Sequence, residues 1–186
     1  APNLIRASGL SAVVTGIIFT AILPIQPPDG LVNVNTNAFI LITSLKTLMS
    51  IFGLFGVTGL YARQVEEAGW LGLASYLLLT TYFAVQMCIS FIEPTILPLL
   101  TSAAPAFVES ALAMTSGTTG SMNLGALQTV YSLASVLFIF GLVLFGIATS
   151  RARILPRGAA ILLAVSGPLA GLLYRLLPDQ LDQLTA

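Results

Sequence analysis

Residues 38–61 have the sequence AFILITSLKTLMSIFGLFGVTGLY, with a single charged side chain, Lys46. A helix of 24 residues that rises about 1.5 Å per residue can cross a hydrocarbon layer roughly 30 Å thick. Gly53, Gly56 and Gly59 recur every three residues, and this spacing places small residues on one helix face. The stretch therefore predicts a membrane-spanning helix that packs closely on a neighbour.

The composition of the whole chain also fits a membrane environment. Of its 186 residues, 56% are hydrophobic and 8% are charged, whereas soluble domains carry about 25% charged residues. Basic and acidic residues balance at seven each, and no basic patch interleaved with aromatics is present, which argues against a nucleic-acid partner. With no histidine and one cysteine, the chain has no Cys/His metal site. We predict that the side chains of this chain ligate no metal and no cofactor. The remaining candidate for a bound molecule is a lipid or other lipophile.

Four further apolar stretches predict an all-α membrane protein, a five-span helix bundle in a single domain, 1–186. The spans are placed at residues 7–24, 38–61, 69–93, 124–150 and 157–177. The first span resembles a signal peptide but lacks a small-x-small cleavage site, so we expect it to be retained. The short turn at 62–68 makes spans two and three antiparallel neighbours. Glu93-Pro94 is expected to end the third span.

The longest connector, residues 94–123, contains a further short helix at 105–114. Its apolar side consists of Phe107, Val108, Ala111 and Leu112. Glu109 lies away from that side. Ten residues cannot cross a bilayer, so we predict an interfacial helix on the extracytoplasmic surface.

The arginines predict the orientation of the bundle. With the N-terminus in the cytoplasm, the cytoplasmic side holds Arg6, Arg63, Arg151, Arg153 and Arg157. The opposite side then holds only Arg175. Basic residues concentrate in short cytoplasmic loops of membrane proteins, so we predict a cytoplasmic N-terminus and an extracytoplasmic C-terminus.

Several polar residues fall at one depth in the outer half of the bundle. The candidate ligand-binding residues are Lys46, Gln86, Gln128, Tyr131 and Tyr82, and Glu93 with Arg175 is a candidate ion pair at the outer ends. Lys46 lies roughly 12 Å into its span, where a charge is costly. One interpretation is an outward-facing cavity in which Lys46 holds a small anionic or carbonyl-bearing lipophile. In the other, Lys46 snorkels to the surface and the glutamines bridge helices.

Few side chains in this sequence could take part in catalysis. Without histidine, Ser50 would need Lys46, four residues away, as its base, but a serine in a membrane helix usually bonds to a carbonyl one turn back. A retinal-type Schiff base on Lys46 would need a carboxylate beside it, and residue counting places Glu93 roughly 13 Å shallower. We predict no catalytic residue and no enzyme.

Ala160, Ala164, Gly167 and Gly171 form the clearest small-residue face of the chain, at spacings of four, three and four. This face predicts a non-enzymatic accessory or scaffold subunit that packs on another membrane protein or on a second copy of itself. The alternative is binding or transport of a small lipophilic molecule around Lys46. Membrane lipids are partners in either case.

Three segments carry a resemblance to known sequences: GVTGLYARQVEEAGWLGLASYLL at 56–78, ISFIEPTILPLL at 89–100 and FGIATSRARILPRGAAILL at 145–163. They resemble a group of small uncharacterised bacterial integral membrane proteins with GLYARQ…GxLGL and LFGIATxRAxxLPR turns. The resemblance covers about a third of the chain, and Leu23-Pro24 and Gln26-Pro27 stand where that group often has His-Pro. It implies a multi-pass protein of the bacterial inner membrane and no particular activity.

Overall fold

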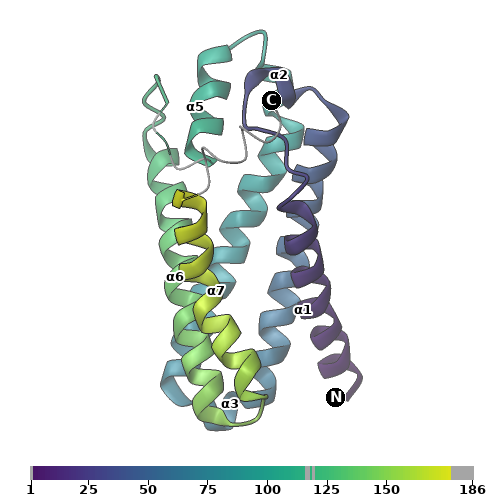
Figure 1. Cartoon of the computed structure of the whole chain (residues 1–186), viewed down its shortest axis with the longest axis vertical. Coiled ribbons are helices and arrows are strands. Elements are labelled where there is room, and N and C mark those ends of the chain that lie inside the picture. Colours follow the sequence, from purple (N-terminus) through teal and green to yellow (C-terminus); the bar gives the residue numbers. More distant parts are fainter. Residues whose placement is uncertain (1, 116–117, 119, 177–186) are drawn as a thin grey trace.

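A computed structural model of the chain describes residues 2–115, 118 and 120–176. Within these ranges it contains helices and turns but no strand, as the sequence predicts. The elements are α1 (Pro2–Ile22), α2 (Leu31–Val34), α3 (Asn37–Thr95), α4 (Leu97–Leu100), α5 (Pro105–Thr115), α6 (Ala126–Ala152) and α7 (Arg157–Leu176). The long helices lie along one axis, and α2 and α5 cover one end of them (Figure 1).

Helix α3 is a hairpin of two antiparallel arms, residues 37–68 and 70–95. Gly69 separates them with φ 55° and ψ −154°, a conformation that glycine adopts without the usual steric cost. The rings of Tyr61 and Tyr76 stack with centroids 4.5 Å apart, although fifteen residues of straight helix would separate them by about 22 Å. The predicted antiparallel pairing of these two segments is therefore present.

Both ends of this hairpin differ from the predicted boundaries. The predicted turn at 62–68 is helical, because alanine, arginine, glutamine and glutamate all favour helix and only Gly69 is needed to reverse the chain. Pro94 does not end the second arm at Glu93. It lies inside the last turn, and the helix continues to Thr95.

The small residues predicted to pack closely do so, but against different neighbours. A Cβ added to Gly53 would lie 2.3 Å from the Phe83 ring, on the other arm of α3. A Cβ on Gly56 would lie 2.8 Å from the backbone of Ala12 in α1. One glycine stripe therefore serves two interfaces, within α3 and between α3 and α1.

The small-residue face of α7 packs inside the same chain. A Cβ on Gly146 of α6 would lie 2.6 Å from the backbone of Ala164 and 2.7 Å from that of Ala160. A Cβ on Gly167 would lie 3.3 Å from the side chain of Leu142, slightly closer than an ordinary contact. Gly171 lies outside the residues whose packing is described. The described part of this face is therefore covered by α6, and α7 follows α6 in the row α1–α3–α6–α7.

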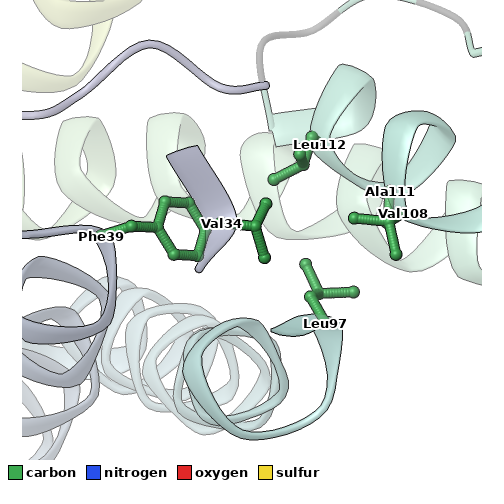
Figure 2. Close-up of a cluster of buried hydrophobic side chains, with 6 residues drawn as sticks. All are labelled: Val34, Phe39, Leu97, Val108, Ala111 and Leu112. Carbon is green, nitrogen blue, oxygen red and sulfur yellow. The ribbon is translucent and has the colours of Figure 1, made fainter. Parts of the chain in front are cut away.

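The short helices form a cap with its own apolar core. Figure 2 shows that core, which consists of Val34, Phe39, Leu97, Val108, Ala111 and Leu112. The predicted apolar side of α5 thus points into the cap, onto α2 and α4, and Glu109 is exposed as expected. Asn35 Nδ2 also donates a hydrogen bond to Thr101 Oγ1 at 3.2 Å. Because α2, α3 and α4 share this core with α5, the apolar side of α5 is not free for lipid.

Three described helices are long and apolar enough to cross a membrane: α1 at Ile5–Ile22, α3 and α6. Helix α7 contributes a shorter apolar segment, Arg157–Leu169. Large apolar side chains point outward on these helices; Leu10 is 65% exposed, Phe55 61% and Leu162 72%. Such surfaces are stable in contact with lipid rather than water, so the fold is that of a membrane-associated helical protein.

Candidate functional site

A layer of polar residues lies between the cap and the apolar core of the bundle. Along the first arm of α3 the order is Phe39 in the cap core, then Lys46, then Val57 in the bundle core. Along the second arm the order is reversed, from Phe83 in the bundle core to Glu93 and then to Leu97 of α4 in the cap core. Since the arms are antiparallel, Lys46 and Glu93 come to the same level.

Glu93 is the central residue of this layer. Its side chain is 3% exposed, and its Oε2 has no hydrogen-bond partner among the described residues. A buried polar atom without a partner costs about 1–3 kcal/mol, and more when it carries charge. The carboxylate attracts the Lys46 ammonium and is repelled by Asp29, which lies in the connector before α2.

Lys46 is partly buried and supplies the positive charge of the layer. Residue counting placed its backbone roughly 13 Å deeper than Glu93, yet the two charged groups are close enough to attract each other. The count was wrong because it assumed a turn at 62–68. The chain reverses at Gly69, so Lys46 and Glu93 lie at nearly equal distances along the two arms and reach the same level. Ser50 Oγ donates to the Lys46 carbonyl at 3.0 Å and not to the amine, which is the ordinary role expected of it.

Tyr131 joins the layer from α6. Its phenol interacts electrostatically with Glu93 and hydrogen-bonds with the side chain of Thr115 at the end of α5. The layer is therefore held by both arms of α3, by α6 and by the cap. Asp29 and Thr115 were not among the predicted site residues, because both lie in or beside connectors whose path the sequence did not indicate.

The main-chain carbonyl of Ser90 is a further hydrogen-bond acceptor in the layer. Pro94 has no N–H, so the carbonyl of Ser90 does not receive the usual hydrogen bond from four residues on. Ser90 is fully buried, and its Oγ accepts a hydrogen bond from Gln86 Nε2 at 2.9 Å. Gln86 thus bonds within its own helix and does not bridge two helices.

Two other predicted site residues, Tyr82 and Gln128, lie apart from Glu93 and Lys46. Tyr82 packs in the bundle core, with its ring 5.1 Å from that of Phe83 and 4.8 Å from that of Phe138. Gln128 is exposed rather than inside the bundle. The side chain of Arg175 lies outside the described residues, so its predicted pairing with Glu93 stays a prediction.

The buried glutamine that does bridge two helices was not predicted. Gln64 is fully buried, and its Nε2 donates to Thr149 Oγ1 of α6 at 2.9 Å, while its Oε1 has no partner among the described residues. The polar run ARQVEEA predicted a solvated turn, so the sequence did not indicate that Gln64 is buried. Its position four residues before Ala68 on a continuous helix would have been the signal for burial.

The polar layer combines charged groups with a phenol. Within the described residues, no group of three or more His, Cys, Asp or Glu side chains could hold a metal ion. The layer offers a cation on Lys46, a buried carboxylate with an open acceptor on Glu93, and a phenol on Tyr131. Asp29 and Glu93 together place more negative than positive charge around Lys46 in the described chain, which disfavours the anionic ligand that the sequence suggested.

Comparisons of this chain with protein-family models, with curated proteins and with solved structures give no match. The resemblance to small bacterial membrane proteins therefore stays a prediction.

Proposed function

We propose that this chain crosses a bacterial inner membrane five times, with a cytoplasmic N-terminus. Supporting this, α1, the two arms of α3, α6 and α7 run in alternating directions between the cap and the opposite end (Figure 1). That opposite end, called the arginine end, carries the reversals at Gly69 and at 153–156 and five exposed arginines. Basic residues of this kind face the cytoplasm in most membrane proteins, so the cap would face outward.

We infer that the protein binds a small lipophilic molecule at the polar layer, as a binding or transport protein and not as an enzyme. The open Oε2 of buried Glu93 is the observation that carries this proposal. A buried acceptor is satisfied by a donor, so the ligand should present a hydroxyl or ammonium group to Glu93, with its apolar part between the helices.

The ligand can be detected without knowing its identity. Protein is purified in mild detergent, and bound small molecules are extracted and measured by mass spectrometry. Lys46→Met and Glu93→Gln are expected to lose a molecule that the parent retains, whereas Arg63→Gln, a charge removal at the arginine end, keeps it. If folded Lys46→Met and Glu93→Gln carry the same small molecules as the parent, or if the parent carries none, the binding proposal is wrong.

The second candidate function is that of an accessory subunit that docks on a partner through α1. The face of α7 that suggested docking is covered by α6, but the outer face of α1 is open. Gly9 and Gly16 have nothing within 4 Å of an added Cβ, and Gly16 lines a groove of about 570 Å³ with Val13, Ile17, Thr20 and Ala21. Gly16→Leu should abolish a protein association seen in native-mass measurements of the parent, without loss of the bound small molecule.

A further inference from the structure

A second groove lies between α6 and α7 near the arginine end, with a volume of about 300 Å³. Its floor is made of small residues, Gly146, Ala160 and Ala164, whose close contact lets the two helix backbones approach. Ile147 and Ile161 form the walls and are 38% and 57% exposed. Gly146 and Ala160 are themselves buried by the contact between the two helices, so the exposed apolar surface of the groove is that of its isoleucine walls.

The groove is polar at one end only. Ser150 and Arg151, in the last turn of α6, line the end that lies toward the arginine end of the molecule. Neither side chain has a hydrogen-bond or ion-pair partner within the described chain. The segment RARILPR at 151–157 adds two more arginines and no acidic residue. The groove therefore carries a positive charge at its mouth and apolar walls further along the helices.

We propose that this groove binds an anionic phospholipid, with the phosphate on Arg151 and Ser150 and one acyl chain between Ile147 and Ile161. Charge complementarity selects this occupant, because a neutral headgroup would leave Arg151 without a counter-charge. A soluble phosphate would use Arg151 but leave the apolar walls bare. The site is separate from the polar layer, and it uses anionic lipid that is abundant on the cytoplasmic side of membranes.

The test uses the full chain in detergent, titrated with dioleoyl phosphatidylglycerol or with dioleoyl phosphatidylcholine and followed by native mass spectrometry. Phosphatidylglycerol should bind the parent about fivefold more tightly than phosphatidylcholine, since this is the contribution of one basic residue to an anionic lipid. Arg151→Gln should remove that preference and leave phosphatidylcholine binding unchanged. Arg63→Gln, at the same end but outside the groove, should change either affinity by less than about twofold.

Two further measurements distinguish lipid binding in the groove from lipid binding elsewhere on the protein. Ile161→Trp should fill the apolar part and weaken both lipids, and it leaves Arg151 in place if the charge variant does not fold. Soluble glycerol phosphate should not compete with phosphatidylglycerol. Equal binding of the two lipids by the parent, equal losses in Arg63→Gln and Arg151→Gln, undiminished binding by folded Ile161→Trp, or competition by glycerol phosphate would each overturn the proposal.

Discussion

The two ends of the bundle handle their polar groups in opposite ways. At the arginine end the chain reverses at the single residue Gly69 and in the short turn 153–156, and the arginines there are exposed. At the cap end the connectors 23–36 and 96–125 are long, they contain α2, α4 and α5, and they cover a carboxylate that is 3% exposed. The arginine end leaves its arginines in solvent, whereas the cap end encloses the Glu93 carboxylate.

This difference predicts where single substitutions are costly. An exposed charge contributes at most about 1 kcal/mol to stability, because water already solvates it. A buried carboxylate depends on its partner, since removal of the partner leaves a charge with no compensation. The polar layer should therefore be sensitive to mutation and the arginine end tolerant, and four measurements can sharpen or break this contrast.

The largest effect is expected for Lys46→Met. Loss of the ammonium removes the positive charge that attracts the buried Glu93 carboxylate, which should lower the free energy of unfolding by up to about 3 kcal/mol at an effective dielectric constant of about 20. Thermal and denaturant unfolding in the same detergent would measure it. The double variant Lys46→Met/Glu93→Gln should recover most of the loss, whereas Arg63→Met, at the other end, should cost less than about 0.5 kcal/mol. Equal losses in Lys46→Met and Arg63→Met would remove the contrast between the ends.

A smaller loss is expected for Gly69→Ala. The backbone at Gly69 has φ 55° and ψ −154°, a region that is essentially restricted to glycine and costs another residue roughly 1–3 kcal/mol. Unfolding of Gly69→Ala should show a loss in that range, although nothing lies within 4 Å of the added Cβ. Gly9→Ala has equally open surroundings but ordinary helical backbone, so it should gain up to about 1 kcal/mol. A gain in both variants would mean that the reversal does not need glycine.

Arg153→Gly is expected to stabilise the protein. Arg153 ends α6 in the left-handed conformation, with φ 56° and ψ 17°, where glycine is the favoured residue. The gain should be about 0.5–1 kcal/mol, because glycine also loses more freedom on folding. Arg151→Gly removes the same charge from helical backbone and should lose about 1 kcal/mol. The same sign in both variants would show that charge, not backbone conformation, decides stability at this end.

The smallest net effect is expected for Gln64→Leu/Thr149→Val. This double change removes the hydrogen bond between α3 and α6 together with the unpartnered Oε1 of Gln64. Replacing both partners by apolar groups of similar size is nearly neutral or stabilising, within about 1 kcal/mol. Thr149→Val alone should cost more, since it leaves the Gln64 amide unpaired. A large loss in the double variant would mean that the arginine end also depends on a buried polar contact.

The sequence predicted the helices well because their signals are local. Apolar length and small-residue spacing indicated the long helices, and the Pro start of residues 105–114 indicated α5. The partners of each face were not predictable, since spacing says that Gly53 and Gly56 share a stripe but not that one meets Phe83 and the other Ala12. Likewise, the face at Ala160 and Ala164 signals close packing without saying whether the neighbour belongs to the same chain.

The site was predicted only in part. Depth counting brought Lys46, Glu93 and Tyr131 to one half of the bundle, but it assumed a turn at 62–68. It therefore separated Lys46 from Glu93, which the reversal at Gly69 brings to the same level. Depth alone also does not say which way a side chain faces, and Gln128 was placed inside the bundle although its side chain is exposed. Thr115 could not be found this way, because its approach to Tyr131 depends on how a thirty-residue connector, 96–125, folds back.

The reversal at Gly69 also bears on how the chain is made. With one residue joining the arms, almost no hydrophilic loop separates them during synthesis, so residues 37–95 are expected to leave the translocon as a ready-paired unit. The interface around Phe83 would then form at insertion, before α6 and α7 emerge from the ribosome. Such a pair would give α6 and α7 a preformed surface on which to pack. The helices would then assemble in the order in which they are synthesised.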